Sequence, residues 1–171
     1  MAILARNAGA LRDLAHRLPG SLPLVADVTH FGSLDGLINN AGQSHGARVE
    51  EIDPEPFEQI FRLNVLAPII AMQTVVPFTR ATGGGVIVNI SSGTAFMAIP
   101  GYSVYSASKR AQLGVTQTAR AELAGDGIVI NAVYPTLTAT NFGANRIGTG
   151  PDADYSVGDP RGYVAGLIDR A

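Results

Sequence analysis

The chain has 171 residues, enough for one domain with a buried core. Charged residues make up 15% of it, against about 25% in an average soluble domain, so we expect extensive burial, including surface covered by another subunit. The net charge is −2 and there is no basic stretch, which argues against nucleic acid or an anionic membrane as a partner.

The chain contains no cysteine, which excludes disulfides, thiolate metal sites and cysteine nucleophiles. Its three histidines, His16, His30 and His45, lack metal-ligand spacing, so we expect no metal site. The apolar run at the start is too short for a signal peptide, and no apolar run reaches about 18 residues. We therefore expect a soluble, cytoplasmic protein.

Strand-like and helix-like segments alternate along the chain, which indicates a mainly parallel α/β layered domain. The predicted elements are a strand over 2–5, a helix over 7–18, strands over 22–26 and 37–38, a long helix over 54–79, a strand over 86–90, a helix to about 124, a strand over 128–133 and a last helix over 160–170. We interpret residues 1–171 as a single domain. The segment 136–158, rich in Gly, Asn and Thr, is predicted to be a mobile substrate lid.

The long helix is expected to be irregular near its middle. Asn64 interrupts its apolar stripe, and Pro68 has no backbone N–H to donate. The carbonyl near Asn64 should therefore lose its helical partner and the helix should bend there.

Tyr105 and Lys109 are four residues apart, so on a helix their side chains lie on one face. A free phenol has a pKa of roughly 10, and lowering it to about 7 requires about 4 kcal/mol of phenolate stabilisation. An ammonium about 4 Å away, at an effective dielectric constant near 20, supplies about that much. The pair can therefore make Tyr105 a general acid/base, while the Ser92 hydroxyl, at the end of a buried strand, holds a carbonyl oxygen.

This stretch has two other interpretations. Tyr105 and Lys109 could be surface residues that are spaced by one helical turn without any chemistry. The segment Ser106–Lys109 also matches the S-x-x-K motif of serine acyl-enzymes, but the S-D-N and K-T-G elements of that family do not occur in the chain. A serine hydrolase is therefore disfavoured.

Six short motifs occur in an order that resembles the short-chain dehydrogenase/reductase superfamily, the nicotinamide-dependent oxidoreductases built on a Rossmann sheet. The motifs are Asp27-Val28, Asn39-Asn40-Ala41-Gly42, Leu63-Asn64-Val65, Asn89-Ile90-Ser91-Ser92, Tyr105 to Lys109, and Asn131-Ala132-Val133-Tyr134-Pro135. The resemblance covers roughly residues 1 to 142. It implies a doubly wound, mainly parallel sheet with helices on both faces.

The resemblance also implies catalytic roles. Tyr105 would give or take the proton of the substrate hydroxyl, and Lys109 would lower the Tyr105 pKa and hold the nicotinamide ribose. Ser92 would hydrogen-bond the carbonyl oxygen, although it could instead merely cap a turn. Asn64, at the helix irregularity, would position a water that connects Lys109 to solvent.

For the cofactor, the resemblance implies contacts with the adenine from Asp27 and Val28, with the adenosine from Asn40 and with the nicotinamide amide from Thr138. Arg6 follows the first strand, where family members that prefer NADP often carry a basic residue. NADP(H) is therefore favoured over NAD(H). The alternatives are structural: Asp27 could close a strand, Asn40 could fix backbone between strands, and Arg6 could be solvated.

The chain departs from the family in its cofactor half. The Gly-rich pattern T-G-x-x-x-G-x-G, which lets backbone amides approach the pyrophosphate, is absent from the sequence. Met1 falls where the second strand of the family would start, and about one helix's length is missing after Asp27-Val28. Thr136 also stands where a glycine is usual. We interpret the chain as an N-terminally truncated member, without the usual first strand and helix and with weak or absent cofactor binding.

By descent, the predicted function is NADP(H)-dependent interconversion of a secondary alcohol and a ketone. The alternative is a catalytically silent member that acts only through subunit contacts. Family members commonly dimerise through helices corresponding to about 55–80 and 104–124, so a homodimer or homotetramer is expected. The substrate itself cannot be read from the sequence, but Phe96, Met97, Ile99, Tyr102 and Phe142 suggest an apolar pocket for hydrophobic ketones.

Overall fold

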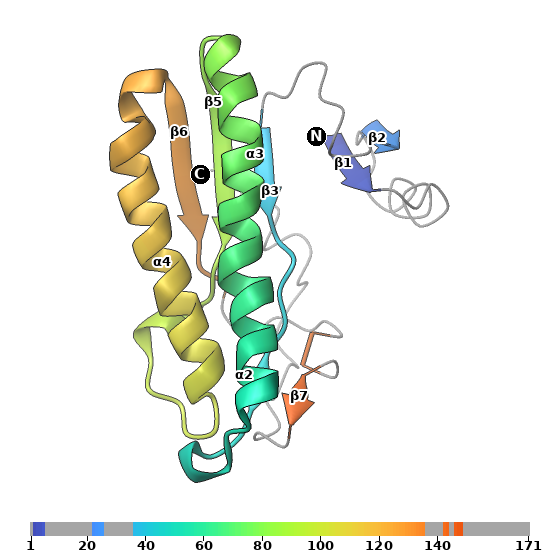
Figure 1. Cartoon of the computed structure of the whole chain (residues 1–171), viewed down its shortest axis with the longest axis vertical. Helices are drawn as coiled ribbons and strands as arrows, with labels where there is room; N and C mark the ends of the chain where they lie inside the picture. The colour runs from blue at the N-terminus through green and yellow to red at the C-terminus, as the bar shows by residue number, and fades with distance from the viewer. Residues whose placement is uncertain (1, 6–21, 26–35, 136–141, 144–145, 149–171) are drawn as a thin grey trace. The chain divides into compact units, whose positions relative to one another are not determined.

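The computed structural model describes residues 2–5, 22–25, 36–135, 142–143 and 146–148 (Figure 1). The chain divides into two compact units, Met1–Ser33 and Leu34–Ala171. Our prediction that they form a single domain stays a prediction. The expected helices over 7–18 and 160–170, and most of the expected lid over 136–158, lie outside the described residues.

The first unit contains two short parallel strands, β1 (Ala2–Ala5) and β2 (Leu22–Val25). They pair in register from Ala2 with Leu22 to Ala5 with Val25. Both strands were predicted from their apolar runs, and Ala26, the last residue of the second predicted strand, lies outside the described residues.

The second unit is built on three parallel strands in the order β3-β5-β6, comprising Gly36–Asn39, Gly85–Ile90 and Ile128–Val133. The strand β5 is central because it pairs with both neighbours, and it lacks polar alternation at 86–88, as expected for a parallel sheet. Among the described residues, β1-β2 and β3-β5-β6 are separate sheets.

Two long helical segments lie side by side over this sheet (Figure 1). The first comprises α2 (Pro54–Phe61), the π-helical turn η2 (Arg62–Leu66) and α3 (Ala67–Ala81), and the second is α4 (Ser103–Leu123). A buried apolar cluster joins α3 to the strands and consists of Met72, Ile87, Ile128 and Ile130. Because side chains alternate along a strand, Val88, Ile90 and Val133 form a second cluster on the opposite face of the sheet.

The irregularity expected near Asn64 is the π-helical turn η2. The N–H of Ala67 donates to the carbonyl of Arg62, five residues back, instead of the usual four. Pro68 follows at the start of α3, where its missing donor does least harm. Asn64 lies within the turn and is fully buried, so the disruption places a polar side chain in the interior.

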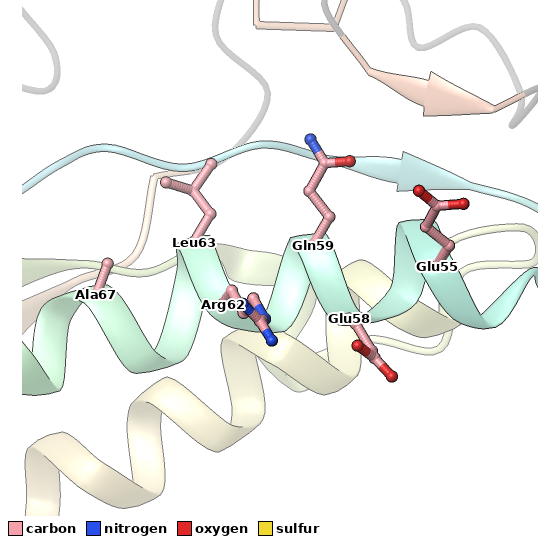
Figure 2. Close-up of a pocket in the computed structure, with 6 residues that line it drawn as sticks. All are labelled: Glu55, Glu58, Gln59, Arg62, Leu63 and Ala67. Atoms are coloured by element: carbon pink, nitrogen blue, oxygen red, sulfur yellow. The ribbon is translucent and has the colours of Figure 1, made fainter.

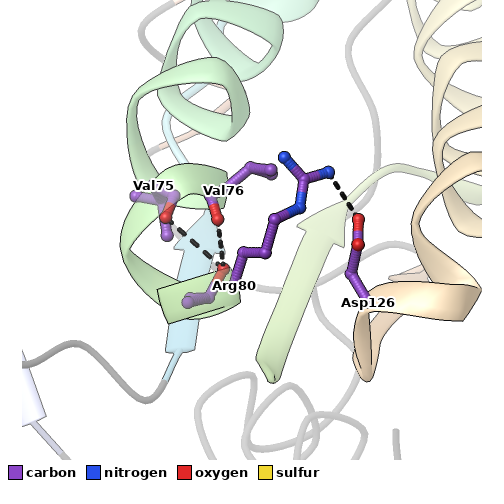
Figure 3. A network of polar contacts seen from close by, with 5 residues as sticks. Val75, Val76, Arg80 and Asp126 are labelled. Carbon is purple, nitrogen blue, oxygen red and sulfur yellow. Dashed lines mark hydrogen bonds and ion pairs between the residues drawn. The ribbon is translucent and has the colours of Figure 1, made fainter. Parts of the chain in front are cut away.

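The far end of α3 is fastened to the turn that follows α4. Arg80 Nη2 pairs with Asp126 Oδ2 at 2.5 Å, next to Thr79, whose hydroxyl donates to Val75 and Val76 carbonyls (Figure 3). Asp126 belongs to the short helix η4 (Ala124–Asp126). The ion pair is partly exposed to solvent, so it fixes geometry more than it adds stability.

Two very short strands, β4 (His45–Gly46) and β7 (Ile147–Gly148), pair in parallel beside the N-terminal end of α4. The 3-10 helix η1 (Val49–Glu51) follows β4, and a second one, η3 (Gly93–Phe96), follows β5. Neither the strands nor these helices were predicted, because two to four residues carry no usable periodicity.

By length and composition alone, the segment Pro54–Ala81 could cross a membrane, with a mean hydropathy of 1.5 over its most apolar window. However, Ile60, Met72 and Val75 pack into the interior of the unit. Length and composition do not separate a membrane span from a helix that packs against the core of a soluble protein.

Candidate active site

The carboxyl ends of parallel strands bring the candidate residues to one edge of the sheet. Ser91 and Ser92 follow β5, Asn40 follows β3, and the first turns of α4 carry Tyr105 and Lys109. The Arg110 guanidinium donates to the carbonyls of Ala95 and Met97, which fastens η3 to α4. Ser92, which caps η3, is thereby held alongside the helix that bears Tyr105 and Lys109.

Lys109 is the one lysine in the chain, and the residue is only 3% exposed. Its Nζ donates to the Ile90 carbonyl at 2.9 Å and to Gln112 Oε1 at 3.3 Å. Burial lowers the pKa of Lys109 from 10.5 to about 8, because the interior disfavours the charged form. An ammonium has three donors, so among the described residues one N–H remains without an acceptor.

Tyr105 lies next to this ammonium, as the four-residue spacing predicted. The Lys109 Nζ is 5.8 Å from the centre of the Tyr105 ring, within the range of a cation–π contact. A positive charge at this position favours the phenolate over the neutral phenol, which is the direction expected from the spacing of the two residues.

Ser92 does cap a turn, which was the structural alternative for this residue. Its Oγ accepts hydrogen bonds from the Thr94 N–H at 3.2 Å and from Thr94 Oγ1 at 3.1 Å. A hydroxyl that accepts can still donate its own proton, and within the described part of the chain the Ser92 proton has no acceptor. The cap therefore fixes the oxygen and leaves the O–H available to a substrate oxygen.

Asn64 braces the loop that follows β3. Its Oδ1 accepts from the Gln43 N–H at 3.0 Å, and its Nδ2 donates to the Gln43 carbonyl at 2.9 Å and to Ser108 Oγ at 3.0 Å. Ser108 donates in turn to the Tyr105 carbonyl at 2.7 Å. Asn64 thus links the loop to the turn of α4 that carries Tyr105, and its predicted water relay stays a prediction.

The loop after Gly42 is tied to η2 through Gln43, whose backbone N–H and carbonyl both bond the Asn64 side chain. Gly42 itself belongs to the Asn39-Asn40-Ala41-Gly42 motif. A Cβ at this position would lie 3.2 Å from Asn64 Oδ1 and 3.6 Å from Lys109 Nζ. The glycine therefore keeps open the space beside the Lys109 ammonium.

Residues 42–46 also match the G-x-S-x-G pattern of a hydrolase nucleophile elbow, through Ser44. That pattern requires a strand, a sharp turn and a helix. Here Ser44 is 3% exposed and is followed by β4, and its carbonyl accepts from the Ile147 N–H. The match carries no hydrolase site.

A ladder of polar side chains, not anticipated from sequence, crosses the sheet to α4. Asn39 Nδ2 donates to Asn89 Oδ1 at 2.7 Å, and Asn89 Nδ2 donates to Thr116 Oγ1 at 2.9 Å. The signal that could have revealed it is an asparagine in the otherwise apolar strand β5. In α4, Gln112 and Thr116 also follow Lys109 at helical spacing.

Asn40 lies exposed at the end of β3, where the resemblance placed it, and its contact with the adenosine stays a prediction. Arg6, Asp27, Val28 and Thr138 lie outside the described residues, so their expected contacts with the cofactor stay predictions too. Among the described residues, no group of three or more acidic or histidine side chains could hold a metal ion.

Apolar side chains flank the site. Phe96 and Met97 are exposed, Phe96 packs edge-on against Tyr134 with ring centres 5.0 Å apart, and Phe142 lies 5.8 Å from the Tyr105 ring. A different hollow, of about 640 Å³, lies along α2 and the start of α3 (Figure 2). It is lined by Glu55, Glu58, Gln59, Arg62, Leu63 and Ala67 and by none of the candidate site residues.

The sequence pattern of the short chain dehydrogenases matches residues 23–149. An uncharacterized oxidoreductase of Thermotoga maritima is 37% identical over 127 residues, which cover 74% of this chain and 51% of the relative. A 3alpha-hydroxysteroid dehydrogenase of Mediterraneibacter gnavus is 40% identical over 112 residues, covering 66% of this chain and 45% of the relative. The chain thus spans about half the length of these curated relatives.

Solved structures agree with the fold. A gluconate 5-dehydrogenase of Burkholderia cenocepacia, in complex with NADP and tartrate, has a TM-score of 0.72 at 26% identity, covering 82% of this chain and 62% of its own. A 3-ketoacyl-(acyl-carrier-protein) reductase of Brucella melitensis, complexed with NADH, has a TM-score of 0.73 at 25% identity, covering 85% and 68%. The architecture is therefore an α/β fold of the Rossmann type.

Proposed function

The chain belongs to the short-chain dehydrogenase family. From this membership we propose that it catalyses the nicotinamide-dependent interconversion of a secondary alcohol and a ketone, with Tyr105 as the general acid and base. The observation that carries the proposal is the buried Lys109 ammonium, held by two acceptors and lying 5.8 Å from the Tyr105 ring. A buried cation beside a phenol has a chemical use, since it stabilises the phenolate that a general acid leaves behind.

In the reductive direction, Tyr105 gives its phenolic proton to the carbonyl oxygen, and the Ser92 O–H donates a hydrogen bond to the same oxygen. The Lys109 charge then stabilises the phenolate. When bound, the nicotinamide supplies or accepts the hydride at the carbonyl carbon. Reduction leaves Tyr105 as a phenolate, so it has to be reprotonated from solvent once in each turnover. In the oxidative direction the phenolate takes the proton of the alcohol hydroxyl.

The described residues fit the nicotinamide side of such a cofactor. Lys109 has a spare N–H for a ribose hydroxyl, and Gly42 keeps the adjacent space open. The preference for NADP(H) over NAD(H) rests on Arg6 and is part of the proposal. Because the Gly-rich pyrophosphate turn is absent from these 171 residues, we expect weak affinity.

For the substrate we propose a hydrophobic ketone or secondary alcohol. Phe96 and Met97 are 62% and 54% exposed, next to the strand end that carries Ser92. Apolar side chains that remain in water at the mouth of a polar site favour an apolar ligand.

A second candidate function is a role in subunit contacts alone, and one observation favours such contacts. A groove of about 580 Å³ runs between α3 and α4, and its lining is mainly apolar, with Gly114, Gln73, Thr118 and Glu122 among the lining residues. A Cβ at Gly114 would meet nothing within 4 Å, so the fold of one chain does not require glycine in this helix interior, where it costs about 1 kcal/mol relative to alanine. We propose that the groove receives the same helices of a second copy, giving a homodimer or homotetramer.

Members of this family are typically soluble, and we propose a soluble protein that works in the cytoplasm on a small molecule, without nucleic acid or membrane as a partner.

The direct test is turnover of NADPH and NADH with a panel of hydrophobic ketones by the purified chain and by Tyr105→Phe. We expect slow ketone-dependent oxidation of the cofactor and a loss of at least about 100-fold in the variant, the low end of what a positioned general acid contributes. Equal turnover by the two proteins would overturn the role of Tyr105. A complete lack of turnover in the wild type, together with a stable dimer, would favour the second candidate.

A further inference from the structure

Gln112 is a buried polar side chain for which neither the fold nor the family resemblance supplies a role. It lies one turn after Lys109 on the face of α4 that packs toward the sheet, and it is 2% exposed. Its Oε1 accepts from Lys109 Nζ at 3.3 Å. Its Nε2 is buried and has no hydrogen-bond partner among the described residues.

An unpaired buried amide donor is unfavourable, and an apolar side chain of similar size would avoid the penalty. Packing alone therefore does not explain glutamine at this position. The Oε1 has to face Lys109, because an ammonium has donors only and would repel the amide N–H group. The Gln112 side chain therefore acts through its oxygen, which accepts a hydrogen bond from Lys109.

The backbone of Gln112 is linked to the sheet by hydrogen bonds. The Gln112 backbone carbonyl accepts from Thr116 Oγ1 at 2.7 Å, and Thr116 Oγ1 accepts from Asn89 Nδ2 at 2.9 Å. The Asn89 side chain is bound in turn by Asn39. This ladder ties the turn of α4 that carries Gln112 to β3 and β5, so the acceptor is offered to Lys109 from a fixed position.

Few other groups near Lys109 can accept a hydrogen bond from its ammonium. The ammonium contacts the Ile90 carbonyl from β5 and the Gln112 amide and Tyr105 ring from α4, and Gly42 lies beside it in the loop after β3. Among these groups Tyr105 is the other titratable one. No carboxylate is recorded against Lys109 in the part of the chain that the structure describes.

We propose that Gln112 is a positioning residue that holds the Lys109 side chain beside Tyr105 and keeps it protonated in an interior that would otherwise favour the neutral amine. This inference rests on the proposed function, because it gives Lys109 the charge which that chemistry uses. A neutral Lys109 would leave the Tyr105 phenolate without its counter-ion.

The single lysine allows a direct test on the chain without any ligand. Protein labelled with ¹³C-lysine gives one Cε signal, from Lys109, whose chemical shift follows the protonation of Nζ across a pH titration. A hydrogen bond to a charged group supports that charge, so we expect Gln112→Leu to lower the Lys109 pKa by roughly one unit. We expect Gln112→Glu, which keeps an acceptor oxygen and adds a negative charge, to raise it.

The matched control is Gln117→Leu, the same substitution at an exposed position of α4, and it should leave the Lys109 titration unchanged. If Gln112→Leu does not fold, Gln112→Met provides a second apolar variant of similar length. An unchanged Lys109 pKa in folded Gln112→Glu together with a folded apolar variant would overturn the proposal and leave Gln112 a packing residue.

The outcome is separable from that of the proposed function. A shifted Lys109 titration without any ketone turnover would keep the positioning role and sink the oxidoreductase. Ketone turnover with an unshifted Lys109 titration would support the oxidoreductase and overturn the positioning role of Gln112.

Discussion

At the scale of single residues, the burial of Lys109 controls the chemistry of the site. A lysine in water is protonated far above neutral pH, whereas here the interior brings its pKa to about 8. Lys109 is thus mostly charged at pH 7 and mostly neutral by pH 9. The site therefore has a cation for Tyr105 near neutral pH and loses it under mildly alkaline conditions.

This burial has a consequence for stability that can be measured. The folded-state pKa lies below the unfolded value of 10.5, so between pH 8 and 10.5 the unfolded state binds more protons and folding becomes more favourable as pH rises. The contribution is fully present above pH 10.5, is lost as pH falls to about 8, and amounts to about 3 kcal/mol. We expect urea unfolding of the wild type to show this rise relative to Lys109→Met. Parallel pH profiles for the two proteins would contradict it.

Residue spacing predicts the pair of candidate catalytic residues, but it does not predict the residues that hold them in place. Tyr105 and Lys109 could be paired from sequence because a helix puts residues four apart on one face. The contacts of Asn64 could not be foreseen, since it binds the backbone of Gln43, and backbone groups leave no mark on a sequence. Gln112 was missed because a glutamine in a helix is ordinarily a solvated residue.

At the scale of the elements, two turns at the ends of the helices have to pass very close to each other. Gly84 has a φ of 131°, and a Cβ there would lie 2.4 Å from the Gly127 carbonyl oxygen. This approach lets α3 end and β5 begin beside the turn that starts β6.

We expect Gly84→Ala to destabilise the fold by roughly 2–4 kcal/mol, through the clash and the positive φ together. Gly125→Ala is the matched control, because a Cβ at Gly125 meets nothing within 4 Å and its φ is not positive. Chemical unfolding of both variants measures the difference. Similar stabilities would mean that the two turns separate at little cost.

The elements also show where sequence patterns stop being informative. The long helix was predicted to lose a hydrogen bond before Pro68, from the chemistry of proline alone. That the defect is a π-helical turn depends on the three hydrogen bonds of the Asn64 side chain to Gln43 and Ser108. Partners 21 and 44 residues away are not encoded in local spacing.

At the scale of the whole molecule, exposed apolar surface is the main unexplained property of the second unit. Leu66, Ile70 and Phe78 on the long helical segment are between 42% and 51% exposed. Together with the groove between α3 and α4, this is more apolar exposure than scattered single residues would give. The low charge content of the chain, noted from sequence, has the same explanation if a second copy covers this side.

Gly114→Arg tests that assembly without disturbing the fold of one chain. The new side chain enters open space in a monomer and blocks the groove to a partner. We expect sedimentation velocity to show a dimer or tetramer for the wild type and a monomer for Gly114→Arg. The control Gly125→Arg, at an equally open glycine outside the groove, should keep the wild-type assembly. An unchanged assembly in Gly114→Arg would place the interface elsewhere.

The central claim is that this chain carries a site built for a nicotinamide cofactor next to Tyr105 and Lys109. It is tested most directly by titrating the purified chain with NADPH and following the intensity and wavelength of nicotinamide fluorescence, with Lys109→Met in parallel. The account predicts weak but saturable binding, with enhanced and blue-shifted emission that is reduced in the variant. Absence of saturation up to millimolar NADPH and NADH, in a chain that is folded, would contradict it.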